Sequence, residues 1–389
     1  MGKLRDLKYK TRYNFYKYFL VPFCSIRRNR ILIMSFNGSN YGCNPKAISD
    51  FLLQNYSSEI NLFWAFSKKR RPENIDKRIK TVVFPSIRYF WVAATAKIII
   101  HNTNFYTVGG GFVRKNNQFY LQTWHGTALK KIEKDVEATL SEGYVRKAKE
   151  EEAMWSVVLS GSKYCTNTIK NSFWYSGKVL ETGMPRNDVF FNDDQFLREK
   201  IFAKYGIKKQ TEIVFFCPTF RESMKDFTYN LNTSLLLDTL SAKFGGNWKL
   251  LVRLHPNIMD EDLSRFLQIS SETVNVTHYP DIQELLYISN ILITDYSSVM
   301  FDFMLTKRPV FLYANDGECY DRGTYLDIKN LPFPFSENNE KLAENINRFS
   351  MENYAENLQL FENKVLIPCE DGSASQRAGE IIMEQIGKE

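Results

Sequence analysis

The sequence has little of what a metal site or a disulfide scaffold requires. Its 389 residues include only six cysteines and four histidines. No two cysteines stand at CxxC spacing, so a zinc site is not expected. The cysteines are also too scattered for a disulfide framework, which favours a reducing compartment. No grouping of carboxylates resembles a metal site either, and the sequence therefore predicts no metal and no cofactor.

Long apolar runs are also missing. The first apolar stretch is interrupted by tyrosine, lysine and asparagine, so it does not resemble a secretory signal. The most apolar later run, residues 91–100, contains Lys97 and is shorter than the roughly 20 residues that span a bilayer. We therefore expect no integral membrane protein. The 44% hydrophobic and 15% aromatic content exclude a disordered chain, and the length suits two domains.

Positive charge is concentrated at the N-terminus. The net charge is +7, and residues 1–30 hold nine basic side chains against one acid. The rest of the chain carries 42 basic and 43 acidic groups. Because this body is near neutral and shows no recognised nucleic-acid motif, nucleic-acid binding is not expected.

The basic N-terminal segment, residues 1–30, is also aromatic. Residues 4–20 read as a helix in which Tyr9, Tyr13, Tyr16 and Leu20 share a face, and further phenylalanines (Phe15, Phe19) extend it. A short amphipathic helix of this kind suits the interface of an anionic membrane leaflet. The alternative is a helix packed on the body with its charges solvated. The excess of positive charge favours the membrane-association segment.

From residue 31 onward, short apolar runs alternate with helical patterns, which predicts an α/β fold with parallel sheets. A breaker cluster near residues 183–185 separates two such series. We therefore expect two Rossmann-like domains, 31–185 and 186–389, with C-terminal helices at about 338–387 in the second. The expected strands are 31–36, 62–66, 81–84, 98–100, 157–159 and 179–181, then 213–217, 249–254, 274–277, 291–294 and 310–312.

Polar residues that follow apolar runs are candidates for the site, because ligands bind at the carboxyl ends of strands in open α/β sheets. His125 lies in Trp124-His125-Gly126-Thr127, before a helix expected from about Ala128. Gly126 would allow close backbone approach, and Thr127 would cap a helix whose N–H groups favour an anion. His125 could accept a proton from an attacking hydroxyl. The alternative is a histidine that only ends a strand.

His255 is the second candidate. It follows an expected strand, and Arg253 alternates with apolar neighbours so that both side chains project to one side. A guanidinium beside an imidazole suits a phosphate. A buried histidine bonded to the backbone is an equally acceptable interpretation.

A third candidate is the run Thr294-Asp295-Tyr296-Ser297-Ser298, which links a strand to an expected helix. Ser297 and Ser298 would lie at the helix N-terminus, where amides and hydroxyls can cradle a phosphate. Plain N-capping by Asp295 or Ser297 is the alternative.

Thr219 and two arginines, Arg221 and Arg186, complete the candidate set. Thr219 and Arg221 follow the first strand of the second series, and Arg is a preferred planar partner of phosphate. Arg186, at the expected domain junction, could reach a cleft or could be a solvated turn residue.

Together these segments resemble the CDP-glycerol:poly(glycerophosphate) glycerophosphotransferases, the primases and polymerases of teichoic acid and related capsule synthesis. The resemblance covers roughly residues 30–385, with Phe220 where the family often has Trp. The matching pieces are Trp124-His125-Gly126-Thr127, Gly183-Met184-Pro185-Arg186-Asn187-Asp188, Pro218-Thr219-Phe220-Arg221, Arg253-Leu254-His255-Pro256, Thr294-Asp295-Tyr296-Ser297-Ser298 and Tyr320-Asp321-Arg322-Gly323.

The resemblance implies a GT-B-like fold, with two domains facing across a cleft and the donor nucleotide on the second. It implies transfer of glycerol phosphate or ribitol phosphate from a CDP-polyol to a hydroxyl of a lipid-linked acceptor, a polyprenyl saccharide or polyol phosphate, with release of CMP. The enzyme would work peripherally at the cytoplasmic face of the cell membrane, and the family's two activity-linked histidines fall on His125 and His255. The alternatives are a GT-B glycosyltransferase that uses a nucleotide sugar and a non-catalytic scaffold.

Overall fold

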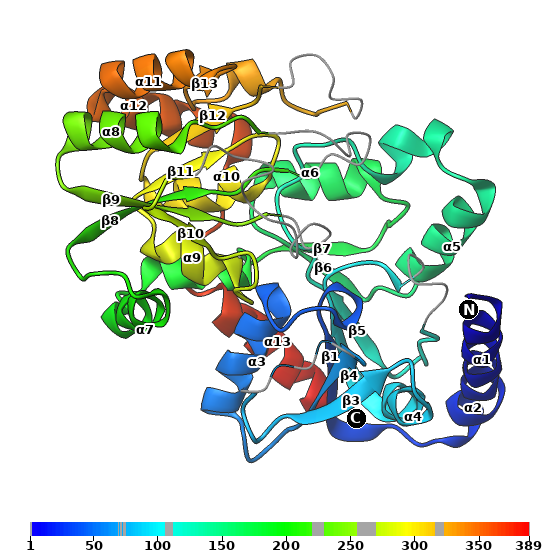
Figure 1. Cartoon of the computed structure of the whole chain (residues 1–389). Helices are drawn as coiled ribbons and strands as arrows, with labels where there is room; N and C mark the ends of the chain where they lie inside the picture. The colour runs from blue at the N-terminus through cyan, green and yellow to red at the C-terminus, as the bar shows by residue number, and fades with distance from the viewer. Residues whose placement is uncertain are drawn as a thin grey trace. The chain divides into compact units, whose positions relative to one another are not determined.

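The computed structural model divides into two compact units (Figure 1). The N-terminal unit contains Met1–His125, Ile132–Asp188 and Pro368–Glu389, and the C-terminal unit contains Gly126–Lys131 and Val189–Ile367. The structure describes residues 2–68, 70, 72, 75–105, 112–219, 229–254, 270–315 and 323–388.

The N-terminal unit is built on a seven-stranded parallel sheet of order β3-β2-β1-β4-β5-β6-β7. The strands are β1 (Arg27–Met34), β2 (Asn61–Ser67), β3 (Lys80–Phe84), β4 (Ala96–His101), β5 (Phe119–Gln122), β6 (Val157–Ser160) and β7 (Lys178–Glu181). The helices that accompany them are α3 (Cys43–Asn55), α4 (Ile87–Thr95), α5 (Glu142–Glu152), α6 (Lys163–Ser172) and α13 (Ala374–Gly387).

Side chains of this sheet alternate between two buried clusters, as expected for a parallel sheet covered on both faces. Ile31 and Ile33 of β1 pack in one cluster with residues of α3 and α13, whereas Leu32 and Met34 pack in the other with α4. The helices α3 and α13 lie side by side (Figure 1). Gly379 permits this approach, because a Cβ there would lie 2.5 Å from the Phe51 ring.

The C-terminal unit has a six-stranded parallel sheet of order β10-β9-β8-β11-β12-β13. Its strands are β8 (Thr211–Phe216), β9 (Asn247–Val252), β10 (Thr273–Asn275), β11 (Ile291–Thr294), β12 (Val310–Tyr313) and β13 (Phe335–Ser336). Its helices are α7 (Gln195–Tyr205), α8 (Thr233–Phe244), α9 (Ile282–Ile288), α10 (Val299–Phe303), α11 (Asn339–Arg348) and α12 (Met351–Phe361). The predicted βαβ pattern is therefore present in both units.

The N-terminal helix exists, and its two faces have different environments. It runs as α1 (Gly2–Phe15), a π-helical turn (Tyr16–Leu20) and α2 (Val21–Phe23). Tyr16 is fully buried, stacks 5.0 Å from the Phe90 ring and hydrogen-bonds through its hydroxyl to the Val113 backbone. The predicted tyrosine face therefore packs on the body of the N-terminal unit. This packing was the alternative to the membrane interpretation of the helix.

The other face of that helix is aromatic and exposed. Phe15 and Phe19 stack at 5.4 Å and are 42% and 57% exposed, and Tyr18 and Phe23 are 59% and 81% exposed. The prediction that Phe15 and Phe19 extend the tyrosine face is therefore wrong. The two side chains form a separate, exposed face of the helix. We call these four residues the outer aromatic face.

The prediction that the second domain, 186–389, extends to the C-terminus does not match the division of the chain into two units. The unit boundary falls after Asp188, and residues from Pro368 onward return to the N-terminal unit. The reason is packing and capping: α13 buries Ala378 and Ile382 in the cluster with α3. The Asp188 carboxylate accepts hydrogen bonds from the first backbone N–H groups of α13, at 3.0 and 2.7 Å.

The prediction of a helix that starts near Ala128 is also wrong, because the helical stretch begins later. Residues 129–131 are extended, with Lys131 N–H donating to the Gly323 carbonyl and Tyr325 N–H donating to the Leu129 carbonyl, both at 2.8 Å. These partners satisfy the backbone in place of helical bonds. A 3₁₀ helix follows at Glu133–Thr139, and α5 begins only at Glu142 after the N-cap Ser141.

Candidate functional site

His125 lies where three neighbouring strands of the N-terminal unit end. The strands β1, β4 and β5 are adjacent and parallel, so the segments after them meet at one edge of the sheet. These segments bring Phe36, Asn102 and His125 together. The His125 Nδ1 atom lies 2.6 Å from the Asn102 carbonyl oxygen, and the Phe36 ring meets the imidazole edge-on at 5.5 Å.

The His125 ring is held neutral in one tautomer. Burial, with a smaller contribution from the Arg186 charge, lowers the pKa of His125 to about 4, although the bond to Asn102 opposes this. Because a carbonyl only accepts, Nδ1 carries the proton, and the lone pair lies on Nε2. At neutral pH the imidazole is therefore a proton acceptor at Nε2.

The loop that carries His125 is held by its backbone. The Asn44 Nδ2 group donates to the carbonyls of Thr123 and Trp124, both at 3.1 Å, and Arg186 Nη1 donates to the His125 carbonyl at 2.6 Å. Trp124 has a φ of 49°, in the left-handed region that non-glycine residues rarely adopt. Three consecutive carbonyls bonded to buried side chains stabilise this turn.

Asn44 and Asn102 were missed by the search of the sequence for reactive side chains. Asn44 is fully buried, and its Oδ1 also accepts from Arg186 N–H at 3.1 Å. Asn102 directly follows β4, so inspecting polar residues after each strand would have found it. Its contribution comes from a backbone carbonyl, which no residue-type pattern reveals.

Arg186 is buried and belongs to the N-terminal unit. Its guanidinium contacts the His125 carbonyl and lies 3.5 Å from the Cys43 sulfur. It is therefore not the solvated turn residue of the alternative interpretation. Direct binding of substrate by Arg186 stays a prediction.

The rest of the Gly183–Asp188 motif holds the returning C-terminal segment. Gly183 has a φ of 77°, and a Cβ there would lie 2.9 Å from a Glu370 carboxylate oxygen. Glu370 accepts from Met184 N–H and from the Asn187 side chain, at 3.0 and 3.2 Å. The motif therefore explains why α13 packs on the N-terminal unit.

Gly126 and Thr127 do not begin a helix. Gly126 has a φ of 147°, and the following backbone is extended, so Thr127 does not cap a helix near Ala128. The expectation that this motif offers helix amides to an anion is wrong, because the chain pairs with residues 323–325 there. A substrate contact of either residue stays a prediction.

In the C-terminal unit, the segments after β8 and β11 meet through Asp295. This carboxylate is buried, and its Oδ1 accepts from both the backbone N–H and the hydroxyl of Thr219, at 2.8 and 2.7 Å. Thr294 is also buried and donates to the Cys217 carbonyl at 2.6 Å. Asp295 and Thr294 thus fix the edge at which Thr219 stands.

Ser297 and Ser298 are half-buried and immediately precede α10. Ser298 is the N-cap residue of this helix, yet its side chain makes no capping hydrogen bond. The expected placement of the two serines at a helix start is therefore observed, and plain capping by a hydroxyl does not account for Ser298.

Arg253 is held inside the C-terminal unit. Its Nη1 donates to the Tyr279 carbonyl at 2.7 Å, and burial lowers the pKa of its guanidinium. His255, Arg221 and Phe220 lie outside the described residues, as does the motif from Tyr320 to Arg322. Within the described ranges, no group of three or more His, Cys, Asp or Glu residues could hold a metal ion.

The chain matches a protein-family model over most of its length. The family described as "CDP-Glycerol:Poly(glycerophosphate) glycerophosphotransferase" matches residues 15–384. The chain is 30% identical over 383 residues to a teichoic acid poly(glycerol phosphate) polymerase of Bacillus spizizenii, covering 92% of this chain and 93% of the relative. It is 32% identical over 374 residues to a teichoic acid glycerol-phosphate transferase of Staphylococcus aureus, with the same coverage.

Another relative is longer. The chain is 31% identical to a teichoic acid poly(glycerol phosphate) polymerase of Staphylococcus epidermidis, of which it covers 51%. Among solved structures, the wall teichoic acid polymerase TagF matches with a TM-score of 0.83 and 28% identity, over 99% of this chain and 97% of that chain. Another structure of TagF is of a variant soaked with CDPG.

These matches confirm the predicted GT-B-like α/β fold, the predicted family and the prediction of an enzyme. The relatives include poly(glycerol phosphate) and poly(ribitol-phosphate) polymerases, so the predicted transferase function in teichoic acid synthesis is confirmed at the level of the family. The chain belongs to the CDP-glycerol:poly(glycerophosphate) glycerophosphotransferase family.

Proposed function

We propose that this chain transfers a polyol phosphate from a CDP-polyol to a hydroxyl of a lipid-linked acceptor and releases CMP. The observation that carries the proposal is His125, a half-buried imidazole that desolvation keeps neutral and whose Nδ1–H donates to the Asn102 carbonyl. A hydroxyl is a weak nucleophile, and a neutral imidazole with Nε2 as its acceptor is the group that the attack requires.

In this step the acceptor oxygen attacks the phosphorus that bears the polyol. A new P–O bond forms, the pyrophosphate P–O bond breaks, and CMP leaves with the bonding electrons. The hydroxyl proton passes to Nε2 of His125. Because negative charge grows on CMP, hydrogen-bond donors at the donor phosphates would stabilise the transition state.

We assign donor binding to the C-terminal unit. The hydroxyls of Thr219, Ser297 and Ser298 stand at the carboxyl edge of its sheet, supported by the buried Asp295. Thr294 and Arg253 hold the same edge through backbone carbonyls. The sequence adds Arg221 as a phosphate partner and His255 as a contact of the donor phosphate or leaving group. The N-terminal unit would then be the acceptor side.

We further propose peripheral binding to the anionic cytoplasmic face of the membrane, where a lipid-linked acceptor would be found. Support comes from the outer aromatic face, whose four side chains are 42% to 81% exposed beside the basic residues of the segment. Aromatic side chains with neighbouring cations favour the headgroup region. Across the described residues, no helix combines the length and apolarity needed to cross a bilayer.

The experiment is an incubation of the protein with a synthetic lipid-linked acceptor and CDP-glycerol, CDP-ribitol or UDP-sugars in parallel. We expect CMP from one CDP-polyol, and an acceptor that gains the mass of a polyol phosphate. Release of UDP with a mass gain of one sugar would replace this function with that of a nucleotide-sugar glycosyltransferase. No turnover with any donor would support the non-catalytic scaffold.

A further inference from the structure

The N-terminal unit has a pocket at the edge of its sheet opposite to His125. The pocket measures about 590 Å³ and lies where β1, β4 and β5 begin, with Lys97 at the start of β4 and residues 115–117 just before β5. A strand rises about 3.3 Å per residue, so the six residues of β4 separate the two edges by about 20 Å. The pocket is therefore distinct from the site of His125.

Cations line this pocket without any carboxylate. Its charged lining residues are Arg28, Lys97, Lys115 and Lys388. Lys388 is paired with Glu384 at 2.8 Å, whereas the ion pairs of the described residues include none to the other three. Three positive charges therefore face the pocket without a counter-charge from the described part of the chain.

Two of these cations are held by neutral groups. Lys115 donates to the Cys24 carbonyl, and Arg28 donates to the carbonyls of Ile386 and Gly387. Carbonyls orient the cations without cancelling their charge, and each cation keeps further N–H donors. Burial lowers the pKa of Lys115, the sign expected for a cation whose desolvation is not offset by an anion.

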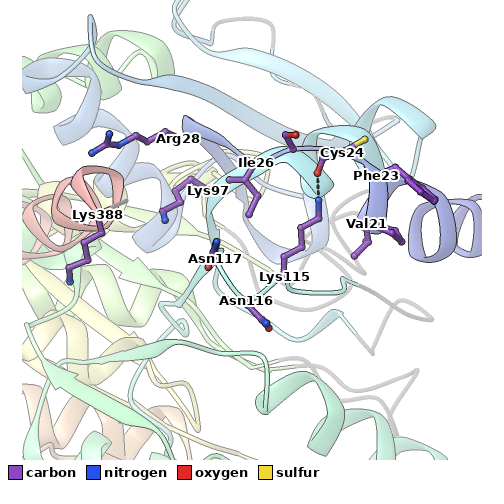
Figure 2. Close-up of a pocket in the computed structure, with 12 residues that line it drawn as sticks. Val21, Phe23, Cys24, Ile26, Arg28, Lys97, Lys115, Asn116, Asn117 and Lys388 are labelled. Carbon is purple, nitrogen blue, oxygen red and sulfur yellow. Dashed lines mark hydrogen bonds between the residues drawn. The ribbon is translucent and has the colours of Figure 1, made fainter.

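The pocket also has an apolar side. Val21, Pro22 and Phe23 line it, and Phe23 is 81% exposed. In Figure 2, Val21 and Phe23 lie on one side, while the side chains of Arg28, Lys97 and Lys388 end on the other. The dashed line there joins Lys115 to Cys24, between the two sides. The pocket thus offers cations and apolar surface to one ligand.

We propose that this pocket binds the phosphate headgroup of one anionic phospholipid, with the acyl chains leaving along Phe23 toward the outer aromatic face. A free phosphate would use the cations but not the apolar side, whereas a lipid uses both. The proposal deepens the peripheral membrane binding proposed above and rests on it. It assigns lipid selectivity to body residues Lys97 and Lys115, in addition to the helix.

The test uses short-chain lipid below its micelle concentration, so that membrane insertion plays no part. Dihexanoyl phosphatidylglycerol, dihexanoyl phosphatidylcholine and sn-glycerol 3-phosphate are titrated by calorimetry against the full chain. We expect saturable one-to-one binding of phosphatidylglycerol. It should bind at least about tenfold tighter than phosphatidylcholine, which has no net charge, and at least about tenfold tighter than glycerol phosphate, which has no acyl chains to contact the apolar side.

The variant Lys97→Gln/Lys115→Gln should lose about tenfold or more of this affinity. The control Lys10→Gln/Lys17→Gln removes the same charge from exposed helix positions and should bind the short-chain lipid as the wild type does. Thermal melting of each variant checks that it folds. A variant that melts early is replaced by Lys97→Met, which removes the charge and keeps the length of the chain.

Three results would overturn the inference. Equal affinity for phosphatidylcholine would remove the charge requirement, equal affinity for glycerol phosphate would indicate a free-phosphate site, and unchanged binding by the folded pocket variant would place the lipid elsewhere. Sedimentation with anionic vesicles separates this inference from the membrane proposal. If the wild type sediments but no short-chain lipid binds the pocket, peripheral binding stands and the pocket assignment fails.

Discussion

The titratable groups of the two units differ in their surroundings. At the carboxyl edge of the N-terminal sheet, burial lowers the pKa of His101 to about 3 and that of His125 to about 4. In α5 of the same unit, burial raises the pKa of Glu152 to about 8. All three changes favour the neutral form. In the C-terminal unit, buried Asp295 accepts two hydrogen bonds from Thr219, and half-buried Arg253 donates to the Tyr279 carbonyl.

The difference matches two chemical tasks. An imidazole must be neutral to accept a proton, and desolvation of the His125 ring favours its neutral form. A site for phosphates needs oriented donors, and hydrogen-bonded polar groups at the end of a sheet orient Thr219 and the serines before α10. The comparison therefore supports placing the base on the first unit and the donor phosphates on the second.

The strongest test of this division is the substitution His125→Ala. Because general-base catalysis contributes about 10²- to 10⁴-fold, we expect CMP release to fall by that factor while the protein folds normally. Initial rates and circular dichroism provide the measurements. The control is His278→Ala, which removes an exposed histidine and should leave the rate unchanged. Near wild-type turnover of His125→Ala would show that the base is another group.

A second test asks whether Glu152, in α5, is protonated in the folded protein and so makes stability depend on pH. Its unfolded pKa of 4.5 lies below the folded value of about 8, raised by burial and then by the Glu133 charge. The contribution of Glu152 to the free energy of unfolding is therefore fully present below pH 4.5 and is lost as the pH rises toward 8. The loss is about 1.4 kcal/mol per pH unit. Since Gln cannot ionise, Glu152→Gln should become more stable than the wild type with rising pH.

Urea unfolding at pH 5 and pH 8 measures this effect. The exposed Glu142→Gln in the same helix is the matched control and should show no such pH dependence. If the difference between Glu152→Gln and the wild type is the same at both pH values, the folded protein does not keep Glu152 protonated.

A third test concerns the donor side. Ser297→Ala/Ser298→Ala should raise the KM for the CDP-polyol about tenfold, the loss of one or two hydrogen bonds to a charged group, with a smaller change in kcat. Ser271→Ala, at an exposed position of the same unit, should change neither constant. Unchanged KM and kcat in the double variant would remove the serines from the phosphate site.

The smallest expected effect is on the pH profile. The pKa of about 4 for His125 predicts that kcat/KM keeps no acid limb from this residue until the pH falls well below 6. An ordinary solvated histidine would give a limb near pH 6.5. A profile of initial rates at low donor concentration, from pH 4.5 to 8, distinguishes the two. A limb at 6.5 that disappears in His125→Ala would mean that the ring is hydrated in solution.

Local patterns in the sequence were sufficient for most of the strands and for the position of His125. Apolar runs bounded by breakers predicted β1, β2, β6 and β11 to within a few residues, because burying a parallel strand requires continuous apolar character. Polar residues after apolar runs correctly marked three strand ends: His125 follows β5, Thr219 follows β8, and the serines before α10 follow β11. The motif order was enough to predict the family.

What the sequence by itself determined was therefore the alternation of elements, the charge of the N-terminal segment and the residue types at strand ends. Only the tertiary structure decided that α13 returns to the N-terminal unit, that residues 129–131 pair with 323–325, and that Asn102 orients His125. The physical reason is that these outcomes depend on backbone hydrogen bonds and packing between distant segments. Local propensity carries no information about such partners, since a carbonyl is present at every residue.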